Sequence, residues 1–310
     1  MKKLLILIPL FLLSACTMGT NLSYNGSRKA PKSNVTILDS KSFNSQQQYG
    51  LPFSEISDLA YNQKTKKLYM IGDKGFFYIF KAKFGKKIEN FEHLKSYKIT
   101  EKNQKKSYDS EGLTLDNRGQ LYISFEKYPR ISSIDKKGYL KSNQKLTKAL
   151  RNRRNYKNSN AIFEALAWHP KYGLLTAAEY PMFKRKNERQ TIYSLRGKRW
   201  NFKAQKHKKS AVTAIEVMDD GNLLILERSY NGLSQPFIIT LKKLYLNNCS
   251  KGGECKTKVM AEFNSYEGWD VNNYEGLTKV GKNRYLMVAD NNNKSFISTT
   301  FIYFKINKDK

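Results

Sequence analysis

The sequence predicts an all-β fold, a β-propeller of four-stranded blades, and three observations lead to this prediction. One pattern of paired apolar strands recurs five times along the chain. The copies begin at residues 57, 111, 164, 213 and 275, which places them 54, 53, 49 and 62 residues apart. Tight turns join the two strands of each pair, as in a propeller blade. We expect five blades, with six as the alternative if one blade is degenerate. The even spacing argues against a two-sheet sandwich.

Each copy opens with a polar residue and a small residue, passes through a turn, and closes with a charged residue. In the second copy, Glu111 opens the first strand, residues 116–119 form the turn, and Glu126 follows the second strand. The opening and closing residues of the five copies are Ser57 and Asp73, Glu111 and Glu126, Glu164 and Glu179, Thr213 and Glu227 or Arg228, and Glu275 and Asp290.

The segments between the copies supply the outer strands. Residues 76–83 and 94–100 complete the first blade, residues 190–195 and 199–204 the third, and residues 237–246 and 258–263 the fourth. Only one strand, residues 300–306, follows the fifth copy. We therefore expect the N-terminal strand at residues 34–39 to complete the last blade. This pairing closes the ring and leaves no sheet edge exposed.

The N-terminus has the pattern of an exported lipoprotein. Lys2 and Lys3 precede an apolar run at residues 4–13 that is too short to cross a bilayer as a helix. Leu13-Ser-Ala-Cys16 matches the lipobox of bacterial lipoproteins, which implies cleavage before Cys16 and acylation of its thiol. An ordinary signal peptide with a chance cysteine is the alternative. We expect a signal peptide at 1–15, a lipidated flexible tether at 16–33 and the propeller domain at 34–310.

The composition limits the partners. The chain has 56 Lys and Arg against 26 Asp and Glu, a formal charge of +30. We expect no nucleic-acid partner, because an exported lipoprotein rarely meets DNA and the chain has no nucleic-acid-binding motif. The densest basic run, residues 141–160, has seven Lys or Arg and no acid. We interpret it as a solvated loop facing anionic lipid head groups or polysaccharide.

The cysteines and the residue after the lipobox fit export. Cys249 and Cys255 flank a Gly-Gly turn, and in an oxidising compartment they are expected to form a disulfide across a hairpin. Thr17, rather than Asp, follows Cys16, which favours the outer membrane facing the periplasm. We expect a monomer held to the membrane by its lipid.

Several motifs together resemble one family. They are Asp109-Ser-Glu-Gly-Leu113, Phe163-Glu-Ala-Leu-Ala167, residues 220–229, Asn273-Tyr-Glu-Gly-Leu277 and Ala289-Asp-Asn-Asn292. They resemble the esterase-like, phytase-like propeller family of secreted bacterial proteins over nearly all of the mature chain. The resemblance implies a calcium-associated β-propeller with a phosphoesterase role. Asp58 and Ala165 depart from the pattern where glycine is usual, so the tight glycine turn is not predicted in those two blades.

The geometry of a hairpin gathers the charged residues of the template. The opening and closing residues lie at the same end of each hairpin, and the first strand of each blade lines the central channel. All five pairs therefore meet at one mouth. We predict metal ligands there at Asp73, Glu111, Glu126, Glu164, Glu179, Glu275 and Asp290. Capping of main-chain N–H groups of the neighbouring blade is the alternative role for any one of these acids.

The fourth copy differs by one residue. The second strand of the other copies reaches its acid five residues after its start, whereas five residues after Leu223 stands Arg228 and not Glu227. Side chains alternate along a strand, so either Arg228 replaces the acid and Glu227 points away, or a bulge restores Glu227. We favour Arg228 at the mouth.

Carboxylates that lie close together repel one another, and a bound cation would neutralise them. At ~6 Å and an effective dielectric near ~20, each neighbouring pair costs about 3 kcal/mol. Calcium accepts six to eight oxygen ligands, and an arginine beside it would bind a phosphate or carboxylate bidentately. His93, His169 and His207 lie outside these motifs, which argues against zinc and against histidine-phosphatase chemistry.

Two functions follow. The first is a calcium-dependent phosphoester hydrolase with Glu111, Glu164, Glu275 and Arg228 as its catalytic residues, acting on a small anionic ligand. The second is a non-catalytic propeller that binds a ligand or a cell-envelope component at the same mouth. A serine hydrolase is less consistent with the sequence, because no Gly-x-Ser-x-Gly motif occurs.

Overall fold

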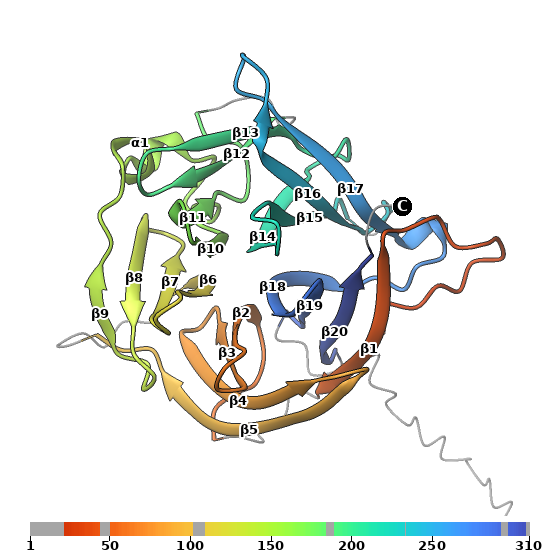
Figure 1. Ribbon diagram of the computed structural model, residues 1–310, viewed down its shortest axis with the longest axis horizontal. Coiled ribbons are helices and arrows are strands. Elements are labelled where there is room, and N and C mark those ends of the chain that lie inside the picture. Colours follow the sequence, from red (N-terminus) through yellow and green to blue (C-terminus); the bar gives the residue numbers. More distant parts are fainter. Residues whose placement is uncertain are drawn as a thin grey trace, which may run out of the picture.

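The computed structural model describes residues 22–43, 50–101, 109–183, 189–232, 234–292 and 297–307. It consists of five antiparallel four-stranded sheets arranged around a central axis (Figure 1). The inner strands of neighbouring sheets contact one another in a closed ring. The predicted five-bladed propeller is therefore confirmed, and the six-bladed alternative is excluded for this part of the chain.

Each blade runs outward from its inner strand in chain order, except that the last blade ends on the first strand of the chain. Blade 1 is β2 (Ile56–Asn62), β3 (Lys67–Gly72), β4 (Phe76–Phe84) and β5 (Ile88–Lys98). Blade 2 is β6 (Ser110–Leu115), β7 (Leu121–Phe125), β8 (Arg130–Ile134) and β9 (Leu140–Asn143). Blade 3 is β10 (Ala165–His169), β11 (Gly173–Ala177), β12 (Arg189–Ser194) and β13 (Arg199–Lys203). Blade 4 is β14 (Ala211–Val217), β15 (Leu223–Ser229), β16 (Ile238–Cys249) and β17 (Cys255–Asn264). Blade 5 is β18 (Asn273–Gly281), β19 (Arg284–Asp290), β20 (Thr299–Ile306) and β1 (Val35–Phe43).

The two ends of the chain close the ring, as predicted. β1, red in Figure 1, lies beside β20, and the pairing runs from Val35 opposite Ile306 to Phe43 opposite Thr299. The Phe43 ring then packs edge-on against Phe301 in its own blade and against Phe80 of blade 1. Buried aromatic rings provide large apolar areas. The closing strand is therefore held both by its ladder and by the core between two blades.

The hydrophobic core is divided among the blade interfaces. Each cluster of buried side chains draws on two adjacent sheets, such as blades 1 and 5 around Phe80 and Tyr303. Since the second strand of a blade is covered on both faces, its side chains are apolar at nearly every position rather than at alternate ones, as in β3 and β19. This continuous burial explains the uninterrupted apolar runs of the repeated pattern.

The outermost elements refine the predicted boundaries. β5 begins at Ile88, six residues before the expected start at 94, because the preceding residues continue the ladder with β4. Cys249 and Cys255 form the expected disulfide at the turn between β16 and β17. Two short helical segments, α1 (Lys148–Arg151) and η1 (Arg153–Asn155), lie between blades 2 and 3, and η2 (Ser265–Glu267) precedes blade 5.

The described residues contain no helix that is long and apolar enough to cross a membrane. Cys16 and the predicted signal peptide lie outside the described residues. The segment that begins at Leu22, expected to belong to a tether, contacts the propeller: Leu22 is buried, and Tyr24 pairs with Trp269.

Candidate functional site

The openings of the inner strands are shaped by β-bulges. In four blades, one extra residue of the inner strand interrupts its pairing with the second strand. The interrupted positions contain Ser57, Glu111, Thr213 and Glu275, the opening residues of the template. A bulge re-aims side chains and often lies beside a functional site. Glu164 instead directly precedes β10, whose pairing with β11 is regular.

Glycine follows the acid in two blades because the neighbouring blade comes too close for a side chain. A Cβ at Gly112 would lie 2.7 Å from the Cβ of Leu166, and a Cβ at Gly276 would lie 2.8 Å from the Cα of Asp58. Such distances require displacement of neighbouring atoms. The Glu-Gly pairs therefore combine a side chain at the mouth with tight packing between blades.

The fourth blade places Arg228 where the other blades have an acid. Ala211 pairs with Arg228 in blade 4 as Asn273 pairs with Asp290 in blade 5, and both pairs precede the bulge. Glu227 points to the other face of the strand, where its carboxylate lies 2.6 Å from the Lys242 amine, and both side chains are almost fully buried. The structure thus has the arrangement favoured from the sequence, in which Arg228 takes the place of the acid.

Three carboxylates meet closely at the mouth beside β6. Ligand oxygens of Asp109, Glu111 and Glu126 all lie within 4.8 Å of one another. Asp109 was not among the predicted ligands, although it stands two residues before Glu111 in the quoted motif. Residues two apart share a strand face, which is the signal that could have identified it. Asp109 also forms a 2.6 Å ion pair with the exposed Lys127 amine.

The acids around this group raise one another's pKa values. Burial, followed by the Glu275 carboxylate, raises the pKa of Asp73 to about 7. Burial, followed by Asp109, raises the pKa of Glu126 to about 8. Burial and the Glu275 charge raise the pKa of Asp290 to about 8. The cluster therefore holds protons at neutral pH that isolated carboxylates would have released.

Two deeper acids show the same effect more strongly. Burial raises the pKa of Glu111 well above its usual value, and the nearby charge of Glu164 adds to the rise. Burial likewise raises the pKa of Glu164, with Glu179 the largest charge contribution. The Glu164 Oε2 atom is buried, and no described group hydrogen-bonds to it. A buried acceptor without a partner is costly.

Arg228 neutralises the other side of the mouth. Its guanidinium hydrogen-bonds to Glu275, to Glu179 at 3.1 Å and to the Asn273 side-chain oxygen at 2.8 Å. Burial raises the pKa of Glu179, and the Arg228 charge opposes that rise. Asn273 was not predicted. It precedes Glu275 by two residues, the same spacing that links Asp109 to Glu111, and it donates to Glu275 at 2.9 Å.

The structure thus brings the seven predicted acids to one end of the channel in two groups. Glu179 and Glu275 are paired with Arg228. Within the described part of the chain no ion pair is formed by the other five, although nearby cations lower the pKa values of two of them, Arg228 that of Glu164 and Lys127 that of Glu126: Asp73, Glu111, Glu126, Glu164 and Asp290. The donors are all oxygens, which suits a hard divalent cation. The unpaired Glu164 oxygen and the close Asp109–Glu111–Glu126 group fit such an ion.

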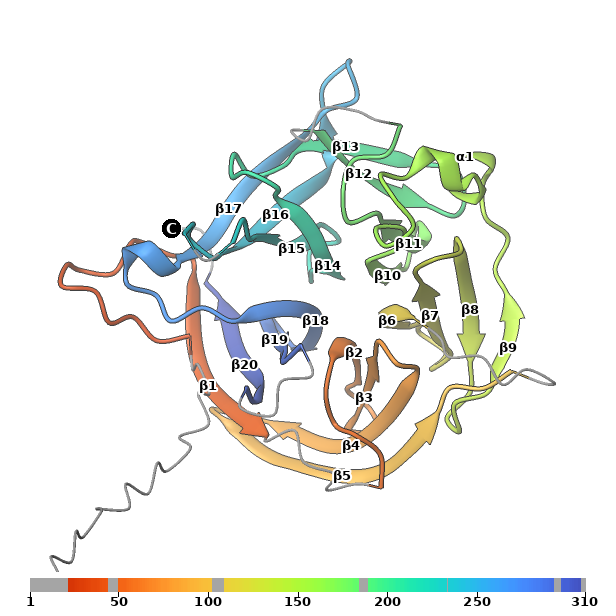
Figure 2. The ribbon, with the colours of Figure 1, turned by 180° about the vertical axis from the view of Figure 1, so that it is seen from behind.

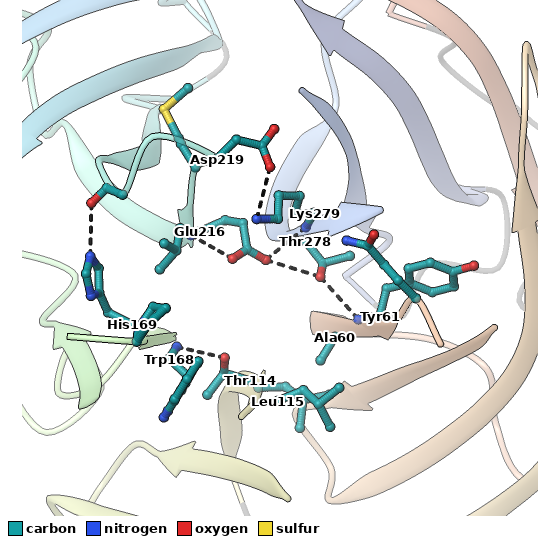
Figure 3. Close-up of a pocket in the computed structure, with 16 residues that line it drawn as sticks. Ala60, Tyr61, Thr114, Leu115, Trp168, His169, Glu216, Asp219, Thr278 and Lys279 are labelled. Atoms are coloured by element: carbon teal, nitrogen blue, oxygen red, sulfur yellow. Dashed lines mark hydrogen bonds and ion pairs between the residues drawn. The ribbon is translucent and has the colours of Figure 1, made fainter. Parts of the chain in front are cut away.

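The opposite mouth of the channel is organised differently. A cavity of about 340 Å³ lies there, lined by the far ends of all five inner strands (Figure 3). One of its two acids, Glu216, accepts hydrogen bonds from the main-chain N–H groups of Val217 and Lys279 and from the Thr278 hydroxyl. His169 bonds to the Gly221 carbonyl at 3.0 Å. These polar groups join one hairpin to the next.

One further acid lies inside the channel with main-chain partners. The Asp58 carboxylate accepts the N–H groups of Leu59, Leu113 and Leu277, which belong to blades 1, 2 and 5. Asp58 is only 3% exposed. The capping role considered from the sequence for the repeated acids is therefore filled by Asp58 and Glu216, neither of which opens or closes a copy of the pattern.

Comparison with known proteins gives a family. The profile of a family named Phytase-like, described as esterase-like activity of phytase, matches residues 51–293. The chain belongs to this family. The match confirms the resemblance indicated by the motifs, and it covers most of the propeller. No curated protein matches the chain.

Solved structures of propellers are similar to this chain at low identity. The PQQ-bound form of aldose sugar dehydrogenase from Streptomyces coelicolor is 11% identical, with a TM-score of 0.48, over 88% of this chain and 98% of that chain. A streptogramin B lyase is 8% identical, with a TM-score of 0.40, over 86% of this chain and 97% of that chain.

Proposed function

We propose that this phytase-like propeller is a calcium-dependent phosphoester hydrolase whose reaction takes place at the acid mouth of the channel. The observation that carries the proposal is the gathering of many carboxylates and few cations there: oxygens of Asp109, Glu111 and Glu126 lie within 4.8 Å of one another, and of these three only Asp109 forms an ion pair in the described part of the chain, with Lys127. Phytase-like proteins are often calcium-dependent, and this chain belongs to that family. A bound calcium ion would polarise a phosphoester and lower the pKa of a water molecule.

We assign cation binding and substrate binding to different residues of the acid mouth. Asp109, Glu111 and Glu126, with Glu164 and Asp73 beside them, would hold the cation through oxygen atoms. Arg228 would bind the anionic group of the substrate. An arginine has five N–H donors, and three of its hydrogen bonds go to Glu179, Glu275 and Asn273. The remaining donors would meet the phosphate, and Glu275 fixes the guanidinium in place.

The proposal also covers how the protein is attached to the membrane. Cys16, in its lipobox, would carry the acyl chains, and the propeller would stand on the outer membrane facing the periplasm. Its substrate would be a small phosphorylated molecule. A second function, ligand binding without catalysis, is favoured by one observation: most donors of Arg228 are already engaged by side chains of the protein.

The test uses the purified full chain. We expect calcium-dependent hydrolysis of p-nitrophenyl phosphate but not of p-nitrophenyl acetate, and loss of this activity with a chelator. Glu164→Gln should lower kcat/KM by about 100-fold or more, as expected for removal of an electrostatic stabiliser. Glu254→Gln, on the opposite-face hairpin, is the matched control and should leave activity unchanged.

Thermal unfolding separates the two functions. Calcium at about 100 times its Kd should add about 2.7 kcal/mol of stability, since it binds only the folded chain. For a domain of this size that raises Tm by roughly 5–10 °C. A calcium-dependent Tm without turnover of either ester would leave only the binding function. A Tm that calcium does not change would refute the cation site.

A further inference from the structure

The face of the propeller at the acid mouth consists of two sets of loops. One set joins the second strand of each blade to the third, and the other joins each blade to the next. Both sets lie at the end where the inner strands begin, because strands alternate in direction within a blade. We call this the acid-mouth face. The opposite face consists of the remaining hairpin turns.

A basic shelf lies on the acid-mouth face between blades 2 and 3. Leu146, Leu150 and Tyr156 are buried and fix this segment to the propeller. Six exposed cations project from it, and within the described residues none of them forms an ion pair with an acid: Lys145, Lys148, Arg151, Arg153, Arg154 and Lys157. The shelf thus presents a fixed array of positive charge.

The same face exposes aromatic side chains. Of the six large hydrophobic residues that are most exposed, four lie on it: Tyr128, Phe183, Tyr230 and Tyr266, between 40% and 67% exposed. Two of them border the shelf, since Arg153 lies over the Tyr128 ring at 4.6 Å and the Phe183 N–H bonds to the Asn155 carbonyl. Aromatic rings next to basic side chains suit the boundary between lipid head groups and acyl chains.

The chain also enters the propeller on this face. Leu22 is 1% exposed, and Ser23 and Asn25 form main-chain hydrogen bonds with Asp270 and Gly268. These partners belong to the connection between β17 and β18, which ends at Asn273 beside Arg228. Only five residues, 17–21, lie between Cys16 and Leu22, and six steps along the chain span at most about 20 Å. A lipid on Cys16 would hold this face close to the bilayer.

The opposite face also exposes cations that form no ion pair within the described residues, among them Lys64, Lys137 and Lys251, but they lie on separate hairpin turns and not on one segment. Its turns carry acids, including Asp116, Asp135, Asp219 and Asp220. Several of these pair with the basic residues nearby, as Asp135 does with Lys141 and Asp220 with Lys243. A basic segment in one connection, exposed aromatic rings and the entry of the chain therefore distinguish the acid-mouth face.

We propose that the acid-mouth face docks on an anionic phospholipid bilayer through its basic shelf and exposed aromatic residues. The proposal rests on the acylation of Cys16 within the proposed function. Each basic side chain near an anionic membrane surface adds to its attraction, and the lipid anchor supplies the second signal that stable attachment requires. A bilayer fits better than a polysaccharide because of the aromatic rings and the short connection to Cys16.

The experiment determines which face of the propeller contacts the lipid bilayer. The acylated full chain is reconstituted into vesicles of phosphatidylglycerol with phosphatidylethanolamine, or of phosphatidylcholine alone. A polarity-sensitive dye is placed at Tyr266→Cys on the acid-mouth face or at Lys137→Cys on the opposite face, with the Cys249–Cys255 disulfide intact. We expect a blue shift of the dye at position 266 in anionic vesicles only. High salt should abolish it, because salt screens surface charges.

Charge variants give the matched control. The triple change Lys145→Gln, Lys148→Gln and Arg154→Gln should abolish the shift at position 266 in anionic vesicles. An equal change on the opposite face, Lys64→Gln, Lys66→Gln and Lys251→Gln, should leave it intact. All six side chains are exposed, so folding should survive in both variants. Circular dichroism and Tm of each variant verify this.

Three outcomes would overturn the docking proposal: no shift at position 266, an equal shift at position 137, or an equal shift when dextran sulfate replaces the anionic lipid. The mass of the purified chain reports acylation separately. If the acyl group is absent, the anchor fails, while docking is still read by adding the labelled chain to anionic vesicles. The ester assays test hydrolysis independently of both.

Discussion

At the acid mouth, Glu111, Glu126 and Glu164 lie among other carboxylates, and the pKa of each is raised by burial and by its neighbours. At the opposite mouth, Glu216 accepts two main-chain N–H groups and a hydroxyl. The two mouths are made from the two ends of the same inner strands, which Figures 1 and 2 view from opposite sides of the ring. Glu216 joins main-chain groups of two blades, whereas the acids of the acid mouth are surrounded mainly by other carboxylates.

The largest effect is expected inside the channel, at the capping carboxylate. Asp58→Ala would leave the N–H groups of Leu59, Leu113 and Leu277 without their acceptor. A buried donor without a partner costs about 1–3 kcal/mol, so we expect a loss of about 4 kcal/mol in the free energy of unfolding. Urea unfolding measures it. Asp73→Ala at the acid mouth is the comparison, and a similar loss there would remove the distinction between capping and ligand-binding acids.

The next effect is a pH dependence to which the acid mouth contributes beside Asp58 and Glu216, whose pKa values burial also raises. The pKa of Asp290 is raised to about 8 in the folded chain, far above its value in the unfolded chain. Between about pH 4 and pH 8 the folded chain therefore holds a proton that the unfolded chain has released, and stability falls as the pH rises. One such proton costs about 1.4 kcal/mol for each pH unit, or about 3 kcal/mol between about pH 5 and pH 7.

Calcium should remove that dependence, since a bound cation favours the ionised carboxylates. Tm measured across this range with chelator and with calcium gives the two profiles. A calcium-free Tm that rises with pH would contradict the raised pKa values of Asp73, Glu126 and Asp290. Parallel profiles would contradict the assignment of the titrating groups to the cation site.

The smallest effect is a matched pair of Glu→Gln changes with opposite signs. Glu164→Gln removes a buried carboxyl that in the folded chain must either keep a proton or be charged among like charges, and should stabilise the calcium-free chain by about 1 kcal/mol. Glu216→Gln replaces one accepting oxygen by an amide that faces a main-chain N–H, and should destabilise it by about 1 kcal/mol. Chemical denaturation measures both. Changes of the same sign in the free energy of unfolding of both variants would mean that the two glutamates have similar surroundings.

Much of this contrast could be predicted from the repeats. The five copies gave the blades, the closing strand and the end of the channel at which the opening and closing residues meet. Counting five residues from Leu223 favoured Arg228 over Glu227 at the mouth, because side chains alternate along a strand. The sequence prediction did not include Asp109 and Asn273 among the site residues. Each stands two residues before a predicted acid, and its side chain lies beside that acid.

The sequence by itself determined which residue types stand at the ends of the repeated strands, since hairpin turns and alternating burial are local properties of the chain. The tertiary structure alone decided which carboxylates find a main-chain N–H. Asp58 meets Leu113 and Leu277 only because the ring closes blade 5 against blade 1 and the bulges shift the registers. It also decided that Leu22 returns to the acid-mouth face. Contacts between blades depend on distances across the closed ring, and no periodic pattern encodes them.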